Sequence, residues 1–264
     1  MDGSKTEKLY RLGMDAYATC DYDHAIDAFK SLLSYDFKHL HGHYYLALSY
    51  QKTENFELAL EHLLMCVKFG FDEVDLYKGI GLSYQKMGMY RESIYNIQKH
   101  LRSHKDDHEA YAILAENYIL LSQFDHAITS LNQAVSLAPQ EVPYYLTLAK
   151  LHKELEEFDQ ALLEIKKALA LQPNAWETHF IGGTLYTGIK VPLEAIKFYS
   201  RSIELNPDHA LSYNNIAISY CDADQMLYAY EAIKTAVSLE GNNQNFQKNL
   251  QKIKKIIEEK NSIS

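Results

Sequence analysis

The strongest constraint on the fold is an internal period of 34 residues. Sliding the sequence against itself by this interval brings seven segments into register without an insertion, and together they span residues 6–243. The segments begin at Thr6, Leu40, Val74, His108, Val142, Trp176 and Ala210. A period of this length indicates one supersecondary unit repeated along the chain, in which each copy buries its apolar face against its neighbours.

Small residues recur at two positions of every segment. The twentieth position holds Ala25, Ala59, Ser93, Ala127, Ala161, Ala195 and Ala229. The eighth position holds Gly13, Ala47, Gly81, Ala115, Ala149, Gly183 and Ala217. Positions 4, 7, 8 and 11 share one face of a helix, and positions 20, 24 and 27 share one face of a second helix. Because small side chains let the two helices approach closely, each segment is predicted to be a helix–turn–helix unit.

The pattern resembles the tetratricopeptide repeat (TPR) family, whose period is 34 and whose signature includes small residues at positions 8 and 20 and proline at position 32. Pro139, Pro173 and Pro207 occupy position 32 of three segments. The resemblance covers about nine-tenths of the chain, since residues 6–243 are in phase. It implies an all-α fold, a right-handed superhelical α-solenoid of helix–turn–helix repeats.

Some positions depart from the family pattern. Proline at position 32 is replaced by Phe37, Phe71, Lys105 and Gly241. In the sixth segment, Gly182 replaces a Leu or Ile, and Pro192 stands where most segments carry Tyr or Phe. His100 occupies a position that is usually small. The Gly182-Gly183 pair indicates either a flexible point or a close helix contact.

The period also predicts the domain organisation. An N-terminal tail of residues 1–5 precedes seven repeats, at 6–39, 40–73, 74–107, 108–141, 142–175, 176–209 and 210–243. Phe246, Leu250, Ile253 and Ile257 then follow helical spacing, with lysines mostly on the other side. Residues 244–260 are therefore expected to form a capping helix, followed by a C-terminal tail at 261–264.

Composition narrows the class of protein. The chain has 264 residues and 47% hydrophobic residues, with only 11 Gly and 5 Pro, which favours a helical globular protein. A net charge of −9 argues against a nucleic-acid partner. The polar N-terminus and the lack of a long apolar run predict no secretory signal and no membrane insertion. Three separated cysteines suit a reducing compartment, so a cytoplasmic location is expected.

Histidine clusters raise the question of catalysis or metal binding. The motif YDHAI at 22–26 returns as FDHAI at 124–128, three periods later, with Asp23 and Asp125 at the expected start of a second helix. A carboxylate there stabilises free N–H groups, so this recurrence is structural. The stretches HLHGH (39–43) and HLRSHKDDH (100–108) lie at repeat junctions. We expect polar junctions rather than metal sites, no catalytic residues, no cofactor and no enzyme activity.

In TPR proteins, positions 2, 5, 9 and 12 of the first helix, with positions 6 and 13 at the edges, line the inside of the superhelix and hold a segment of another protein. In repeats one to three these positions contain more apolar and aromatic residues than the packing face requires. The predicted ligand-binding groove is lined by Tyr10, Met14, Tyr17, Tyr44, Tyr45, Leu48, Gln51, Lys52, Lys78, Leu82, Gln85 and Lys86. The alternative is that neighbouring helices partly bury these side chains as packing residues.

The sequence therefore predicts a non-enzymatic scaffold or adaptor, or a chaperone-like protein, that binds a peptide or protein segment in its concave groove. A carboxylate clamp of the cochaperone type is not expected, because Lys78 is followed by Leu82 where that clamp has Asn. One alternative is a self-assembling structural protein whose aromatic groove forms a homo-oligomer contact. A His-dependent metal-binding or catalytic role is the weaker alternative.

Overall fold

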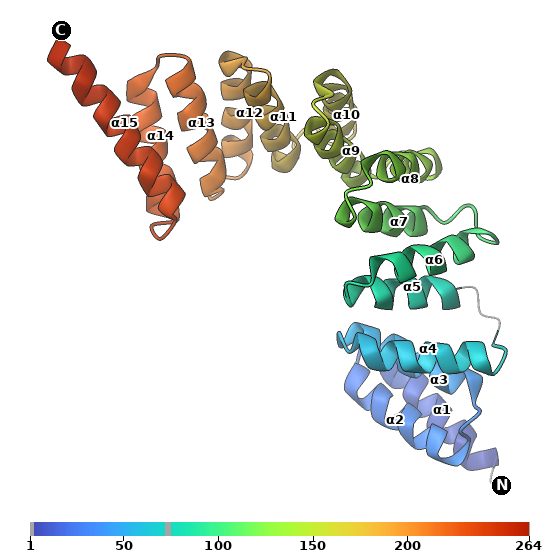
Figure 1. Ribbon diagram of the computed structural model, residues 1–264. Helices are drawn as coiled ribbons and strands as arrows, with labels where there is room; N and C mark the ends of the chain where they lie inside the picture. The colour runs from blue at the N-terminus through green and yellow to red at the C-terminus, as the bar shows by residue number, and fades with distance from the viewer. Residues whose placement is uncertain (1–2, 72–74, 264) are drawn as a thin grey trace. The chain divides into compact units, whose positions relative to one another are not determined.

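The computed structural model describes residues 3–71 and 75–263, with side chains for residues 5–71 and 75–259. All regular structure in these ranges is α-helical, which confirms the predicted all-α class (Figure 1). The helices are α1 (Gly3–Ala18), α2 (Tyr22–Tyr35), α3 (Leu40–Lys52), α4 (Phe56–Lys68), α5 (Leu76–Lys86), α6 (Tyr90–Leu101), α7 (His108–Leu120), α8 (Phe124–Leu137), α9 (Val142–Glu154), α10 (Phe158–Leu171), α11 (Trp176–Gly188), α12 (Pro192–Leu205), α13 (Ala210–Asp222), α14 (Met226–Leu239) and α15 (Gln244–Ile263). Among the described helices, none combines the length and the apolar character needed to cross a membrane.

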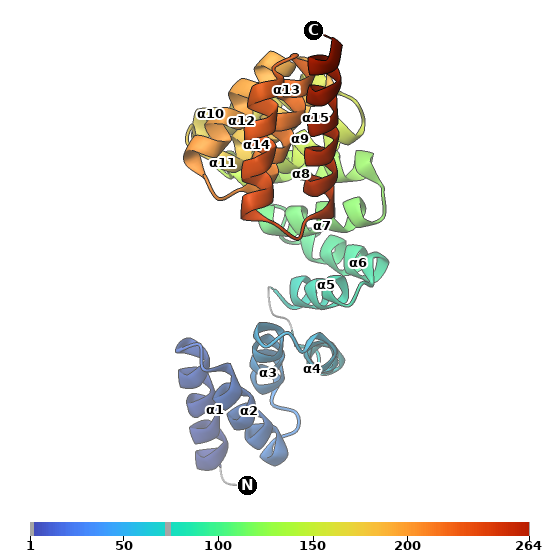
Figure 2. The same cartoon turned by 90° about the vertical axis from the view of Figure 1, so that its left-hand side faces the viewer.

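The helices form two compact units, Met1–Ala138 with α1–α8 and Pro139–Ser264 with α9–α15. Within each unit, consecutive helices pack against one another in series (Figures 1 and 2). Odd-numbered helices also contact the next odd-numbered helix of their unit. They therefore line one face of each unit, which we call the inner face: α1, α3, α5 and α7 in the first unit, and α9, α11 and α13 in the second. This serial pairing confirms the predicted solenoid.

Every two-helix hairpin turns through a residue in the left-handed backbone region. These residues recur every 34 positions, with φ from 56° to 76°: Cys20, Glu54, Gly88, Ser122, Glu156, Lys190 and Asp224. In each turn the following N–H donates to a carbonyl five residues back, as from Asn55 to Tyr50 at 2.8 Å. This hydrogen bond is that of a Schellman motif, which ends a helix. Only the third turn uses glycine, the residue best suited to positive φ.

The small residues at positions 8 and 20 lie where two helices meet. Ala25 and Ala59 have no exposed surface. A Cβ on Gly13 would lie 2.5 Å from the ring of Phe29, and one on Gly81 would lie 2.6 Å from Cδ1 of Ile97. Atoms cannot approach so closely without displacement, so the small residues permit the contact between paired helices, as predicted.

The Gly182-Gly183 pair makes a close helix contact. A Cβ on Gly182 would lie 2.4 Å from the ring of Phe198, and one on Gly183 would lie 2.6 Å from the ring of Tyr199. Both glycines are buried inside α11. Of the two alternatives, the structure therefore favours close packing of α12 on α11.

Helix α15 follows the last hairpin and packs on α13 and α14. Phe246 and Ile253 are only 2% and 3% exposed, and the side-chain amide of Asn249 donates to Oδ1 of Asn214 at 2.8 Å. The helix ends at Ile263, three residues beyond the predicted end at 260, so most of the predicted C-terminal tail is helical.

Candidate functional site

The predicted tyrosines form a continuous set of ring contacts on the inner face of the first unit. The ring of Tyr10 lies 5.2 Å from that of His39 and 6.4 Å from that of Tyr45. Tyr45 also lies 5.6 Å from Tyr17 and 5.5 Å from Tyr44. Offset and edge-on ring contacts of this kind stabilise a packed cluster. The structure thus brings these four predicted site residues together.

Burial divides the predicted site residues into two groups. Tyr44 and Gln85 are only 6% and 8% exposed, so they offer almost no surface to a ligand. For these two residues the expectation of an exposed groove is corrected, because neighbouring helices cover them. Half-buried side chains on the core of this unit form the second group: Tyr10, Met14, Tyr17, Tyr45 and Leu48. Leu82 is also half-buried.

The predicted polar groups of the groove mostly bind other parts of the same unit. The side-chain amide of Gln51 donates to the carbonyl of Gly79 at 2.7 Å and to the hydroxyl of Ser83 at 2.8 Å. The amide of Gln85 donates to Oε2 of Glu116 at 3.1 Å. These bonds join successive inner helices, so both amides already have partners within the unit, and their contact with a ligand stays a prediction. Exposed surface remains on Lys52 and Lys86.

Lys78 is also part of an internal junction. Its ammonium group lies 2.9 Å from Oδ2 of Asp107 and 2.8 Å from Oε2 of Glu109. Burial alone lowers the pKa of Lys78, but the hydrogen bonds to Glu109 and Asp107 outweigh it and the pKa is raised. Lys78 is therefore a stable cation that links α5 to the start of α7, and its contact with a ligand stays a prediction.

The same junction contains a possible metal ligand set. Asp75, His100 and Asp107 bring three ligand atoms within 4.8 Å of one another. However, Oδ2 of Asp107 already contacts both Lys78 and Nε2 of His100, the latter at 2.9 Å. A metal ion there would have to displace the lysine ammonium, which already balances the carboxylate. The cluster is best explained as an ion-pair junction between repeats.

The HLHGH histidines have three separate roles. His39 caps α3 by accepting a hydrogen bond from the N–H of Gly42 at 3.0 Å. His41 is exposed, whereas His43 is 1% exposed and lies against His62, with their Nδ1 atoms 2.8 Å apart. His39 is therefore a polar residue at the repeat junction, as expected, whereas His43 is a core residue. The rings of His39 and His41 lie 6.5 Å apart, whereas His43 pairs with His62.

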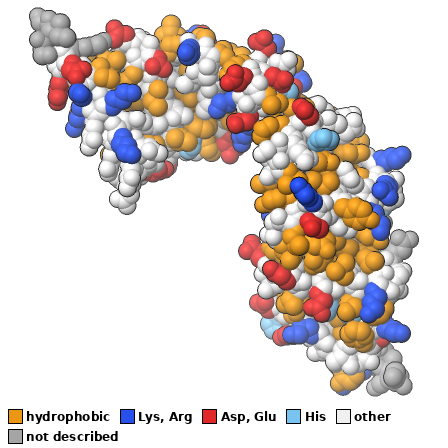
Figure 3. All heavy atoms as spheres, in the orientation of Figure 1, with side chains coloured by type: hydrophobic (Ala, Val, Ile, Leu, Met, Phe, Trp, Pro, Cys, Tyr) orange, Lys and Arg blue, Asp and Glu red, His pale blue; other side chains and the backbone are white. Residues whose placement is uncertain are grey.

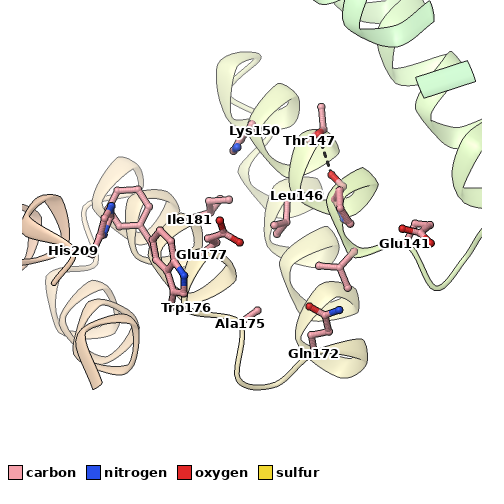
Figure 4. A pocket seen from close by; sticks show the side chains of 13 residues that line it. Glu141, Leu146, Thr147, Lys150, Gln172, Ala175, Trp176, Glu177, Ile181 and His209 are labelled. Carbon is pink, nitrogen blue, oxygen red and sulfur yellow. Dashed lines mark hydrogen bonds between the residues drawn. The ribbon is translucent and has the colours of Figure 1, made fainter. Parts of the chain in front are cut away.

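A second candidate site lies on the inner face of the second unit. It is a hollow of about 690 Å³ between α9 and α11, next to the start of α13 (Figure 4). Leu146 and Lys150 from α9 lie across the hollow from Trp176 and Glu177 of α11. Apolar and short side chains form much of its wall, including Val142, Pro143, Thr147, Ala175 and Ile181.

The aromatic wall of the hollow is held by ring contacts. The ring of His209, the residue before α13, lies 4.5 Å from that of Trp176 and 4.9 Å from that of Phe180. Nδ1 of His209 lies 2.7 Å from the hydroxyl of Ser212. Burial lowers the pKa of His209, so the ring is neutral at pH 7. Ser212 has no exposed surface, so this Ser–His pair has no accessible nucleophile.

Charged groups stand at the rim of the hollow. Glu141, Lys150 and Glu177 are exposed, and none of them forms an ion pair within the described ranges 5–71 and 75–259. The sequence pattern favoured repeats one to three as the binding site and did not point to this region. The available signal was Leu146 and Phe180 at position 5 of successive repeats, beside Trp176, the one tryptophan of the sequence.

Comparisons with known proteins agree with the fold. The sequence model of the tetratricopeptide repeat matches residues 108–141 and 142–175. No curated protein matches the chain in sequence. The C-terminal part of a TPR repeat-containing protein from Cytophaga hutchinsonii superposes with a TM-score of 0.79 at 16% identity, covering 91% of this chain and 99% of that one.

Two further solved structures show the same architecture. A tetratricopeptide repeat protein from Parabacteroides merdae has a TM-score of 0.69 at 15% identity, covering 95% of this chain and 99% of that one. YrrB, described as a TPR protein with an unusual peptide-binding site, has a TM-score of 0.60 at 20% identity, covering 71% and 97%. Identities this low establish a shared fold and leave the ligand of this chain to be argued from its own residues.

Proposed function

We propose that this chain, a tetratricopeptide-repeat protein, is a non-enzymatic interaction scaffold that binds a segment of another protein on its inner faces. The observation behind this proposal is the hollow between α9 and α11, which combines an aromatic wall, an apolar floor and unpaired charges at its rim. Its volume of about 690 Å³ is within the range of ligand sites in proteins. A hollow of this size accommodates a few side chains of an extended segment.

The chemistry of the wall suits this role. Trp and Phe provide a large contact area with few rotatable bonds, and aromatic residues are enriched where protein contacts are strongest. Trp176 and Phe180 are already held by His209, so little side-chain freedom is lost when a ligand packs on them. A large apolar side chain of the partner, placed against Leu146 and Trp176, is the expected anchor.

The tyrosine face of the first unit is proposed as a second contact surface. Tyr10, Tyr17 and Tyr45 are half-buried and retain some exposed ring surface, with exposed Lys52 nearby in sequence on α3. Figure 3 shows apolar side chains gathered over the helices of the first unit on the face in view. An adaptor or chaperone-like role in the cytoplasm is our proposal for such a two-surface binder. YrrB, described as a TPR protein with an unusual peptide-binding site, shares this fold, which is consistent with a peptide-binding role.

A displayed library of random nine-residue peptides tests the proposal. The intact chain should enrich peptides that bind it with micromolar affinity. Phe180→Ala should weaken the selected peptides about tenfold or more, because it removes a central aromatic contact. Thr147→Phe should have a similar effect by filling the hollow, and it leaves the aromatic wall in place.

Leu227→Ala provides the matched control, because Leu227 lies on α14 outside the hollow and is 76% exposed. Circular dichroism should show that all three variants are folded. Failure to enrich any peptide, or equal binding by Thr147→Phe and the wild type, would contradict the proposed site. A concentration-dependent mass without peptide binding would instead support self-assembly.

A further inference from the structure

We propose that the hollow between α9 and α11 selects a dipolar segment of its partner. In this segment, a large apolar residue is bracketed by a basic side chain on one side and an acidic side chain on the other, about four residues apart. This inference rests on the proposed function and adds the charge pattern of the ligand. It follows from the positions of three rim charges.

Two carboxylates lie where helices of the hollow begin. Glu141 is the residue before α9, and Glu177 is the second residue of α11. Both side chains are exposed, and neither forms an ion pair within the described part of the chain. Figure 4 shows them on opposite sides of Leu146, with Glu177 on the side of Trp176, so a basic side chain of a bound segment at the start of α9 would meet Glu141.

The positive charge of the rim lies further along α9. Lys150 follows Glu141 by nine residues, which corresponds to about 13 Å at 1.5 Å per residue. Glu154 lies one turn further on α9, yet Lys150 forms no ion pair with it in the structure as described. Lys150 instead lines the hollow (Figure 4).

Three lysines on the even-numbered helices of the same unit form ion pairs within their own helix. Lys167 pairs with Glu164 at 2.7 Å, Lys197 with Glu194 at 2.6 Å, and Lys234 with Glu231 at 3.1 Å. These pairs join residues three apart on α10, α12 and α14. Lys150 has no acidic residue three positions away on α9, since Thr147 and Lys153 stand there, so its charge remains available to a ligand.

The spacing of the charges sets the spacing in the ligand. An extended chain advances about 3.3 Å per residue, so about 13 Å corresponds to about four residues. Leu146 lies between Glu141 and Lys150 on α9, opposite Trp176. The apolar residue of the segment therefore falls between its two charged residues, over the aromatic wall.

Charge complementarity also predicts the relative affinities of dipolar, dibasic and diacidic segments for the hollow. The rim has two carboxylates and one ammonium, and the whole chain has a net charge of −9. A segment with two acidic residues would meet only one positive group and long-range repulsion. We therefore expect a dipolar segment to bind best, a dibasic one next and a diacidic one least.

Three synthetic nine-residue peptides test this order. Their sequences are Ser-Gly-Arg-Ala-Leu-Ala-Glu-Gly-Ser, the same peptide with Arg in place of Glu, and the same peptide with Glu in place of Arg. Fluorescence anisotropy of labelled peptides gives each affinity. For the wild-type chain the dipolar peptide should bind about two- to fivefold more tightly than the dibasic one, as expected for one exposed ion pair. The difference should shrink at high salt.

Charge reversal in the protein provides the decisive comparison. Lys150→Glu should make the dibasic peptide the best ligand, and Glu177→Lys should raise the relative affinity of the diacidic peptide. Lys153→Glu is the matched control: it changes the same charge on α9, and Lys153 does not line the hollow.

The outcomes separate this inference from the proposed function. In one outcome, Thr147→Phe abolishes peptide binding but Lys150→Glu leaves the order of the three affinities unchanged. This outcome would overturn the dipolar pattern and leave the proposed binding site intact. Absence of binding by all three peptides at millimolar concentration would overturn the dipolar pattern, whereas the proposed function is decided by the library selection. An order that changes with Lys150→Glu and not with Lys153→Glu supports the inference.

Discussion

The imidazole rings of His43 and His62 share a hydrogen bond between their Nδ1 atoms, which lie 2.8 Å apart inside the first unit. Nε2 of His43 lies 2.8 Å from the carbonyl oxygen of Phe37, which can only accept, so this nitrogen carries a proton. In a neutral His43 ring, Nδ1 is then the acceptor and Nδ1 of His62 is the donor. Two histidines 19 residues apart thus have mutually dependent tautomers.

This pair predicts a pH-dependent stability. Burial, together with His43 and Lys30, lowers the pKa of His62 to about 4. A histidine with a lowered pKa binds fewer protons in the folded chain than in the unfolded chain, where its pKa is about 6.5. Its stabilising contribution is complete above pH 6.5 and is lost as the pH falls towards 4. Differential scanning calorimetry between pH 7.5 and 4.5 should show a falling melting temperature.

His62→Gln is the control for this prediction. The glutamine amide can still donate to Nδ1 of His43, but it does not titrate in this range. The melting temperature of the variant should therefore fall less between pH 7.5 and 4.5 than that of the wild type. An identical pH dependence in both proteins would show that His62 does not contribute.

Gly182 and Phe198 are predicted to be a compensating pair. Position 7 is Leu or Ile in the other repeats, and here the ring of Phe198 fills the space that such a side chain would take. Gly182→Leu should destabilise the second unit by roughly 1–3 kcal/mol through overpacking, although it restores the common residue. The double variant with Phe198→Ala should lose at least about 1 kcal/mol less stability than the sum of the two single losses. The reason is that the new leucine side chain can occupy the space that the phenylalanine ring leaves. Strictly additive losses in urea denaturation would contradict the pairing.

Substitution by glycine is predicted to stabilise those hairpin turns whose left-handed residue is not already glycine. Glu156 has a φ of 60°, where a side chain costs energy and glycine does not. Glu156→Gly should therefore raise the free energy of unfolding by about 0.5–1 kcal/mol. Gly88→Ala, at a φ of 76°, should lower it by a similar amount. Opposite signs in these two variants are the expected result of urea denaturation, and equal signs would contradict the argument from φ.

Asp107 is predicted to stabilise the junction between the third and fourth repeats in two ways. Its Oδ1 accepts a hydrogen bond from the N–H of Ala110 at 2.9 Å, and its Oδ2 pairs with Lys78. Burial raises the pKa of this carboxyl, but these bonds and the one from His100 outweigh it and lower the pKa. Asp107→Ala should cost about 1–2 kcal/mol, whereas Asp107→Asn should cost less because asparagine also caps helices. Equal losses in thermal denaturation would show that the cap is unimportant.

The fold was predictable because the period places equivalent residues at equivalent contacts. Ala25 and Gly13 are close-contact residues in the structure as in the pattern. The compensation of Gly182 by Phe198 was not predicted: the pattern left a flexible point and a close helix contact open, although Phe198 is the largest residue at its repeat position. The end of α15 at Ile263 differs from the predicted end at residue 260, because no repeat continues there to fix it.

The candidate site was harder to predict. Gln51 and Lys78 occupy positions that line the groove in TPR proteins, yet they bind a neighbouring helix, and such pairing depends on side-chain geometry that spacing does not specify. The hollow between α9 and α11 depends on the distance between two helices, which the repeat pattern leaves open. Trp176, with Leu146 and Phe180 at position 5 of successive repeats, was the available signal.

The fluorescence emission of Trp176 reports whether a peptide occupies the hollow between α9 and α11. It is the only tryptophan of the sequence, and it lines the hollow, so its fluorescence reports on this site alone. Titration of the intact chain with a library-selected peptide should change the emission saturably, with the dissociation constant obtained by anisotropy. A peptide that binds with no change at Trp176 would place the binding site elsewhere and contradict the account.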